Sequence, residues 1–340
     1  MNVVERNLGR DEWTRLTERL PYLSLLQTWE FAEARTATGR WRPVRALVTD
    51  GQGPVAAFQG IVRTLPVAGG GLLWINRGPL LFNTRIAFEE ILGTVACWAR
   101  ERRWYVRVAP PLEQLDPRGL EAAGFLQTTT PGWSSSAVDL TTSVDQLRSR
   151  LDQKWRNCLN KSIRIGVVVR ATTDDSPFQN YLGALRQRLR RQPFETSVTP
   201  DLLDALQAAL PVDRKMVVFT ATHEETAIGR YVIATYGDTA EYLSSVVGDE
   251  GRQKNAGYAL LWTAITEMRS RGYRRFDLGG MDAERTPAGI YHFKKGAGGT
   301  LYRLANEVET ARQDWRSALI RWRIAAARKR EQSAASRVGG

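Results

Sequence analysis

The chain has 340 residues, of which 43% are hydrophobic and 25% charged, a composition typical of a folded soluble protein and not of a disordered one. Two distant cysteines and two histidines offer neither a disulfide framework nor a metal-ligand set, and no apolar run is long enough to span a bilayer. The formal net charge of +12 favours anionic partners, which include nucleic acid, phosphorylated small molecules and lipid headgroups. The charged start, MNVVERNLGRDEW, does not read as a secretory signal, so we expect a cytoplasmic protein. Because histidines and cysteines are few, we expect no bound metal.

The first part of the chain predicts helical pieces over residues 1–36, followed by a set of strands. The Asp50-Gly51 hairpin signal separates the first two of these strands. The strands are expected at 45–49, 54–65, 72–76 and 104–108, and a helix with Ile91, Val95 and Trp98 on one face is expected at 86–102. A short helix ends at Gly124, which can adopt the backbone conformation that a helix end requires.

The remainder of the chain repeats this pattern with additional helices. Helices are expected at 144–165, 177–191, 201–210 and 259–271, and strands at 167–171, 217–222, 227–236, 241–247 and 274–278. Gly279 and Gly280 end the last strand and open a polar loop, which closes on Phe293, Lys294 and Lys295. Glycines allow backbone and ligand to approach closely, so this stretch predicts the edge of an active site as well as it predicts an ordinary connection.

Two parts of the chain resemble each other. The strand–turn–strand segment RALVTDGQGPVAAFQGIV matches VVFTATHEETAIGRYVIA, and GTVACWARERRWYVRV matches TAITEMRSRGYRRFDL. We therefore predict an α/β protein with two tandem domains of mixed sheets, at 1–143 and 144–310. A basic C-terminal helix with a disordered end, SAASRVGG, occupies 311–340.

Three features are candidates for binding anions. The turn at Lys254, Gly257 and Tyr258 precedes a helix, whose free N–H groups suit a phosphate, and it approximates the turn with which N-acetyltransferases hold coenzyme A. The basic helix at 148–170 can follow a phosphate backbone or present a solvated face. In the C-terminal helix, Trp315 and Trp322 fall at helical spacing, and packing on the body is favoured over contact with an anionic membrane.

The chain contains no G-x-S-x-G, H-E-x-x-H or Walker A motif, and no GxGxxG motif after a strand. Hydrolysis by a serine triad and metal catalysis are therefore unsupported. Four segments taken in order, LLQTWEFAEAR, KWRNCLNKSIRIGVVVR, ALLWTAITEMRSRGYRRFDLGG and GIYHFKKGAGG, resemble the FemABX family. The resemblance covers roughly residues 20–310, and its last two segments are the most specific.

This resemblance implies two tandem N-acetyltransferase-like domains and the transfer of an amino acid from aminoacyl-tRNA to an amine of a peptidoglycan precursor. The precursor is linked to a nucleotide or to a lipid, and no cofactor is needed. Lys294 falls on the lysine that stabilises the reaction in the family, and Phe293 and Lys295 beside it are expected to bind substrate, with Lys295 either a phosphate or tRNA contact or a solvated bystander. Contacts with substrate phosphates are implied for Arg35 and for the region of Arg190 and Arg191, lining of the same site for Trp104, and close backbone approach for Gly279 and Gly280.

Departures from the family pattern fall at Ala109, Ser244 and Ala297. They affect the expected acceptor pocket more than the fold. Two alternatives remain open: an N-acyltransferase that uses acyl-CoA or an acyl carrier protein, and a non-catalytic protein that binds RNA or the inner face of a membrane through its positive charge.

Overall fold

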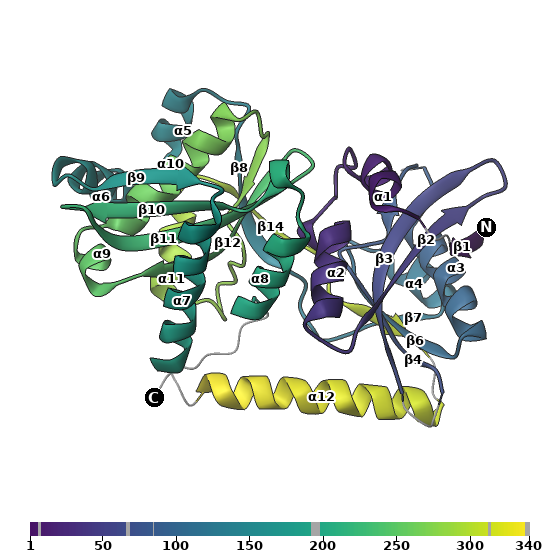
Figure 1. Ribbon diagram of the computed structural model, residues 1–340. Coiled ribbons are helices and arrows are strands. Elements are labelled where there is room, and N and C mark those ends of the chain that lie inside the picture. The colour runs from purple at the N-terminus through teal and green to yellow at the C-terminus, as the bar shows by residue number, and fades with distance from the viewer. Residues whose placement is uncertain (6–7, 66–68, 84, 192–197, 312–313, 337–340) are drawn as a thin grey trace. The chain divides into compact units, whose positions relative to one another are not determined.

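The computed structural model describes residues 1–5, 8–65, 69–83, 85–191, 198–311 and 314–336, with side chains as far as residue 326. The chain forms two compact units. The first consists of residues 1–133 and 303–340, and the second of residues 134–302 (Figure 1). No helix among the described residues is long and apolar enough to cross a membrane.

The first unit is built on a mixed sheet with the order β1-β2-β3-β4-β6-β15-β7, and β5 pairs with β3. Its strands are β1 (Asn2–Glu5), β2 (Arg42–Thr49), β3 (Pro54–Thr64), β4 (Gly71–Asn76), β5 (Leu80–Leu81), β6 (Trp104–Ala109), β7 (Phe125–Gln127) and β15 (Val308–Thr310). Strands β2, β3 and β4 are antiparallel neighbours, whereas β4 and β6 are parallel.

Helices cover both faces of this sheet. They are α1 (Arg10–Thr17), η1 (Leu25–Gln27), α2 (Trp29–Ala37), α3 (Phe88–Glu101), α4 (Pro117–Ala122) and α12 (Trp315–Ser336). Because side chains alternate along a strand, β6 contributes Trp104 and Val106 to the core beneath α3. Its Tyr105 points to the opposite face and packs with Ile320 of α12.

The second unit is built on a sheet with the order β14-β8-β13-β12-β11-β10-β9. Its strands are β8 (Ser134–Asp139), β9 (Val168–Thr172), β10 (Val217–His223), β11 (Thr226–Tyr236), β12 (Thr239–Val247), β13 (Arg275–Asp277) and β14 (Thr300–Arg303). Strands β10, β11 and β12 are antiparallel neighbours, whereas β12 and β13 are parallel. This repeats the order of the first unit and confirms the predicted tandem α/β fold.

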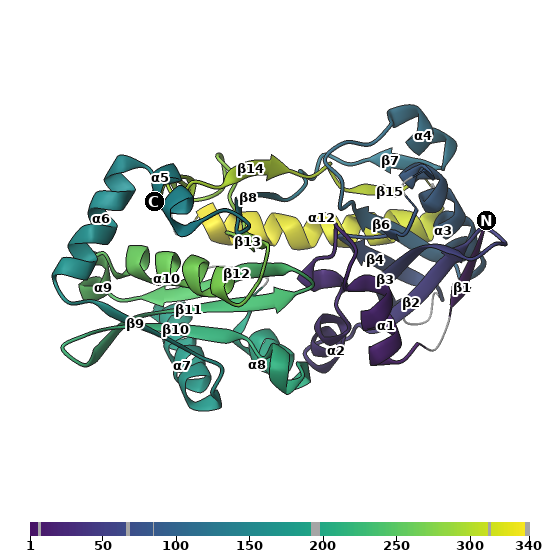
Figure 2. The same ribbon diagram turned by 90° about the horizontal axis from the view of Figure 1, so that it is seen from above.

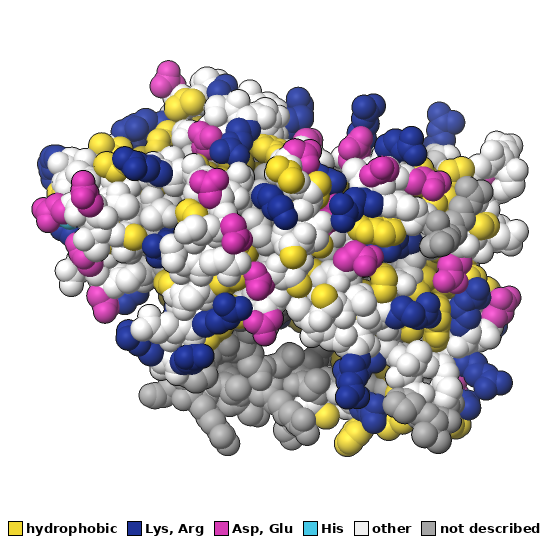
Figure 3. Space-filling view, viewed as in Figure 1, with side chains coloured by type: hydrophobic (Ala, Val, Ile, Leu, Met, Phe, Trp, Pro, Cys, Tyr) yellow, Lys and Arg dark blue, Asp and Glu magenta, His cyan; other side chains and the backbone are white. Residues whose placement is uncertain are grey.

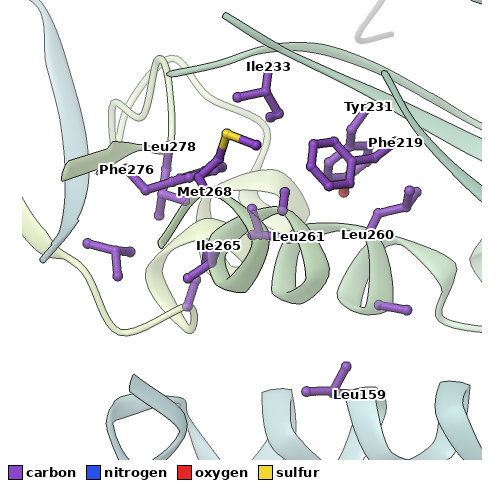
Figure 4. Packing of buried hydrophobic residues seen from close by; sticks show 14 of the residues in the cluster. Leu159, Phe219, Tyr231, Ile233, Leu260, Leu261, Ile265, Met268, Phe276 and Leu278 are labelled. Carbon is purple, nitrogen blue, oxygen red and sulfur yellow. The ribbon is translucent and has the colours of Figure 1, made fainter. Parts of the chain in front are cut away.

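Figure 2 places the helices of the second unit on both faces of its sheet. They are α5 (Val144–Arg150), α6 (Gln153–Arg164), α7 (Asp175–Arg191), α8 (Pro200–Ala209), η2 (Val212–Arg214), α9 (Asp249–Gln253), α10 (Ala256–Ser270) and α11 (Ala288–Lys295). Helix α10 lies between the sheet and α6, and it buries Leu260, Leu261 and Ile265 in the core with Phe276 of β13 and Leu159 of α6 (Figure 4). This core holds the parallel strands β12 and β13 in place.

The boundaries between the two units fall after residues 133 and 302, whereas the predicted boundaries follow residues 143 and 310. Residues 134–139 form β8, which pairs with β13 of the second unit. Residues 308–310 form β15, which pairs with β6 and β7 of the first unit. Each sheet thus gains a strand that local patterns do not assign to it, because strand pairing is a long-range contact.

Several elements differ from the expectation. The predicted helix at 144–165 is interrupted at Leu151, which is extended and buried, and the N–H of Asp152 donates to Gly296. The predicted loop before Lys294 contains helix α11, and residues 2–5 form a strand instead of a helix. The sequence predicts a disordered end from Ser333, but helix α12 continues to Ser336. Residues 337–340 lie outside the described part of the chain.

Candidate active site

Lys294 is a buried lysine at the end of α11, and its side chain is the centre of the candidate site. The residue is 7% exposed. Its Nζ donates to the carbonyl oxygen of Gly280 at 2.9 Å and lies 5.0 Å from the centre of the Tyr242 ring. A buried ammonium group with one protein acceptor keeps hydrogen-bonding capacity for a further partner, because an ammonium has three donors.

The ammonium group lies where the parallel pairing of β12 and β13 ends. The two strands pair through Glu241 and Asp277, and β12 then continues to Val247 while β13 stops. Tyr242 follows the paired stretch on β12, and Gly279 and Gly280 follow it after β13. Lys294 therefore reaches from α11 to the point at which the two strands separate.

Gly279 is required by the backbone at this point. Its φ of +69° lies in the left-handed region, which favours glycine, and a Cβ would lie 2.5 Å from the carbonyl oxygen of Tyr242. The same Cβ would lie 3.6 Å from Nζ of Lys294. The close contact at Gly279 is thus one within the protein, between β12 and the residues that follow β13, and the predicted approach of this backbone to substrate stays a prediction.

Burial lowers the pKa of Lys294 to about 8, while the nearby charges of Asp277 and Glu241 act in the opposite direction. The ordinary value is 10.5. Desolvation disfavours the charged form of an amine, whereas a carboxylate nearby favours it. At neutral pH the lysine is still protonated, yet its proton is held much less tightly than that of a surface lysine.

Asp277 organises the backbone beside Lys294, and the sequence-based search missed it. The carboxylate is 3% exposed and accepts hydrogen bonds from the Ser135 hydroxyl at 2.6 Å and from the N–H of Gly279 at 2.9 Å. It also accepts from the Tyr302 hydroxyl at 2.6 Å and from Arg275 at 3.3 Å. The signal that the sequence offers is an acidic residue at the end of a short strand, two residues before the glycine pair.

Phe293 belongs to an aromatic cluster that supports α11. Its ring stacks on Trp155 at 6.1 Å and meets the edge of Tyr258 at 5.0 Å. The indole N–H of Trp155 donates to the Phe293 carbonyl at 3.0 Å. Burial, followed by the neighbouring Cys158, raises the pKa of Tyr258 to about 12. Phe293 and Tyr258, predicted as parts of separate features, are therefore packed together beside Lys294.

The predicted phosphate turn lies between α9 and α10. Asn255 adopts a left-handed conformation, with φ of +56°, and α10 begins at the next residue. The carbonyl of Gly257 accepts a hydrogen bond from Tyr231 at 3.2 Å. Nζ of Lys254 lies 3.4 Å from Nε2 of His223, the ring nitrogen that is 3.0 Å from the carbonyl of Ile165. Lys254 thus belongs to a group at the far end of α6.

Two predicted binding residues lie in the first unit. Arg35 is half-buried at the end of α2, and its side chain makes no hydrogen bond or ion pair with another described residue. Burial lowers the pKa of this guanidinium group. Trp104 is 7% exposed, and its ring packs edge-on against Trp98 at 5.3 Å. Most of the Trp104 surface therefore contributes to the core.

The remaining predicted residues are exposed cations. Arg190 and Arg191 lie in the last turn of α7, directly before residues 192–197, which fall outside the described part of the chain. Lys295 follows Lys294 but points to solvent. The fold thus brings Lys294, Phe293, Gly279 and Gly280 together, and it leaves Lys295 at the surface beside them.

The prediction for the tryptophans of α12 is wrong. Trp315 is 58% exposed and Trp322 is 65% exposed, so neither packs on the body. Ile320 makes that contact instead, with Leu319 partly buried beside it. Figure 3 shows hydrophobic and basic side chains next to one another along the part of α12 whose side chains are described.

Comparisons with known proteins match both the fold and the sequence. Residues 146–295 match the acetyltransferase (GNAT) domain family, and this range includes Lys294. The chain is 24% identical over 307 residues to the UDP-N-acetylmuramoylpentapeptide-lysine N(6)-alanyltransferase of Weissella viridescens, covering 84% of this chain and 88% of the relative.

Solved structures are similar over most of their length. The crystal structure of FemX has a TM-score of 0.77 at 15% identity and covers 91% of this chain and 97% of its own. The C-terminal domain of a putative lysylphosphatidylglycerol synthetase from Agrobacterium fabrum has a TM-score of 0.54 at 14% identity and covers 85% and 93%, respectively. These likenesses establish the tandem GNAT-like fold.

Proposed function

Because the chain is a member of the FemABX family, we propose that it transfers an amino acid from aminoacyl-tRNA to an amine of a peptidoglycan precursor stem peptide. The observation that carries this proposal is the buried ammonium group of Lys294 at the end of the paired stretch of β12 and β13. The relative from Weissella viridescens is named for alanyl transfer to the lysine of a muramoyl-pentapeptide. The same class of reaction is proposed for this chain.

The reaction needs a positive charge more than it needs a nucleophile on the protein. The neutral acceptor amine attacks the ester carbonyl of the aminoacyl-tRNA, which forms a carbon–nitrogen bond and an oxyanion. The carbon–oxygen bond to the ribose then breaks, and the proton lost by the amine ends on the ribose hydroxyl. A fixed donor at the developing oxyanion is the main contribution that a protein makes to such a step. Lys294, held by Gly280, supplies this donor.

The acceptor carries phosphates whether it is linked to a nucleotide or to a lipid. Arg35 offers a guanidinium group with no carboxylate partner among the described residues, in a half-buried position where a phosphate interaction is less screened than at the surface. We assign it to phosphate binding. The exposed surfaces of Arg190 and Arg191 make them weaker candidates, because solvent screens their charges.

Helix α12 supports peripheral contact with the inner face of a membrane, where lipid-linked precursors reside. Trp315 and Trp322 are seven residues apart, so they lie on one face of the helix, and Arg323 is exposed beside them. Tryptophan and arginine together suit the boundary between headgroups and acyl chains. Sedimentation with anionic vesicles tests this contact, and Trp315→Ser with Trp322→Ser should abolish it.

The transfer itself is tested with purified protein, tRNA charged with labelled amino acids and a nucleotide-linked muramoyl-pentapeptide. Mass spectrometry should detect a product one aminoacyl residue heavier. Lys294→Ala should reduce its formation by about 10²- to 10³-fold, the effect of removing one oxyanion donor. A normal rate in Lys294→Ala would eliminate the role given to this lysine. Tight binding of coenzyme A by calorimetry, without transfer from tRNA, would favour acyl-CoA as the donor.

A further inference from the structure

Helix α6 has a buried face and an opposite face made of cations. Trp155, Leu159 and Ser162 are buried and recur at the spacing of one helix face. The exposed side chains of Lys154, Asn157, Lys161 and Arg164 recur with the same period on the other side. The helix, which reads QKWRNCLNKSIR, contains no acidic residue. Packing explains the first face and leaves the second without a structural role.

The charges on this face are not neutralised within the protein. Lys154, Lys161 and Arg164 have no ion pair with a carboxylate in the described part of the chain, and all three are exposed. Other arginines of the second unit are engaged: Arg148 donates to Asn160, Arg188 to Ser245 and Arg269 to Thr142. The three cations, with Asn157 between them, are called the α6 stripe below.

The α6 stripe runs away from the candidate active site. At the N-terminal end of α6, Asp152 donates to the carbonyl of Gly296 at 3.0 Å, two residues after Lys294. At its other end, the carbonyl of Ile165 contacts His223, which contacts Lys254. Lys154 and Arg164 are ten residues apart, or about 15 Å along the helix. A polyanion whose end reaches Lys294 can therefore follow this face.

The composition of the α6 stripe selects nucleic acid over a lipid surface. A helix that lies on a membrane inserts large apolar side chains on its bound face. The α6 stripe has none, and the exposed Ile163 lies about 180° around the helix from Lys154. Regularly spaced cations and a hydrogen-bonding amide suit phosphate oxygens at intervals along a strand.

We propose that the α6 stripe binds the phosphate backbone of the acceptor arm of the tRNA and so directs its aminoacylated end to Lys294. This inference rests on the proposed function and adds the surface that distinguishes a complete tRNA from its terminal nucleotides. It assigns Lys154, Lys161 and Arg164 to affinity for the donor and gives them no part in the chemical step.

The test compares Lys154→Gln/Lys161→Gln/Arg164→Gln with the wild type, using two donors. One donor is full-length aminoacyl-tRNA, and the other is a short aminoacylated oligonucleotide with the same 3′ end. The matched control is Arg15→Gln/Arg19→Gln/Arg118→Gln, which removes three exposed charges from the first unit. Circular dichroism of all variants checks that they are folded.

For full-length tRNA, the triple variant should raise KM by about tenfold or more while leaving kcat unchanged. The slope of log Kd against log salt concentration should fall by about 2 to 3, because three phosphate contacts are lost. The short oligonucleotide and the control variant should behave like the wild type. An unchanged KM and salt slope for the triple variant would overturn the proposal, as would an equal loss with the short donor.

Failure of the proposed function gives a different result. In that case the wild type transfers from neither donor, although binding of uncharged tRNA still reports on the α6 stripe through its salt slope. A triple variant that loses binding to anionic vesicles and keeps its affinity for tRNA would also overturn the inference.

Discussion

Replacing Lys294 with methionine separates the role of its charge from the cost of burying it. Methionine has a similar length and no charge, so it fills the same space. The difference between the ordinary pKa of 10.5 and the value of about 8 corresponds to about 3 kcal/mol of lost stability at neutral pH. Loss of the hydrogen bond to Gly280 offsets about 1 kcal/mol of this. Lys294→Met should therefore stabilise the protein by about 2 kcal/mol at pH 7.

The stability that Lys294→Met gains over the wild type should decrease as pH rises. Below about pH 8 the lysine is protonated in both the folded and the unfolded chain, so the wild type bears the whole cost of a buried charge. Between about 8 and 10.5 the folded state loses its proton first, and the stability of the wild type rises with pH. By pH 9.5 the remaining cost is about 1 kcal/mol, which the hydrogen bond nearly cancels. The advantage of methionine should then be close to zero.

Urea unfolding at pH 7 and pH 9.5 measures these differences, and hydrogen exchange in α10 identifies the transition that belongs to the second unit. Aminoacyl transfer by the same variant should be lost. A methionine variant that is less stable than the wild type at pH 7, or that gains equally at both pH values, would refute the reasoning. A lysine that lowers stability and is required for transfer is retained for its chemistry.

The other predictions concern the surroundings of Lys294 and the acceptor. The rate of transfer, divided by the fraction of the acceptor amine that is neutral, should fall as pH rises through about 8, because the ammonium form of Lys294 stabilises the oxyanion; a corrected rate that rises through this pH would indicate a general base. Asp277→Asn should cost about 1 to 3 kcal/mol in unfolding experiments and move this fall to lower pH, whereas Ser135→Ala should leave its position unchanged. Gly279→Ala should lower the free energy of unfolding by more than about 1 kcal/mol and slow transfer, since its Cβ would meet the Tyr242 carbonyl. An unfolding midpoint in urea equal to that of the wild type would contradict this. Arg35→Ala should raise KM for a nucleotide-linked acceptor by about tenfold at unchanged kcat, and equal KM values would exclude it from phosphate binding.

Local patterns accounted for most of the elements. The hairpins formed by β2 with β3 and β10 with β11 are both predicted, because alternating apolar residues around a turn specify them within a short stretch. Helices α3 and α10 follow from apolar residues at helical spacing. The likeness of the two segments then predicted the tandem units without knowledge of any long-range contact.

Parts of the site depended on contacts that local patterns do not carry. Lys294 was identified from its family position, but its burial results from the packing of α11 against Trp155 and Tyr258. The role of Asp277 cannot be predicted from local sequence, because its partners Ser135 and Tyr302 are not its neighbours along the chain. Helical spacing predicts packing for the tryptophans of α12, but periodicity indicates a common face without indicating which face is buried.

The sequence by itself determined the two repeated α/β units, the basic charge and the lysine that follows Phe293. Apolar periodicity, turn residues and motif spacing act over a few residues, so they can be interpreted from the chain alone. Only the tertiary structure decided which strands complete each sheet and how Lys294 reaches the end of the β12–β13 pair. It also decided the environment that lowers the pKa of Lys294, because desolvation and charge proximity depend on groups that the chain brings together from distant positions.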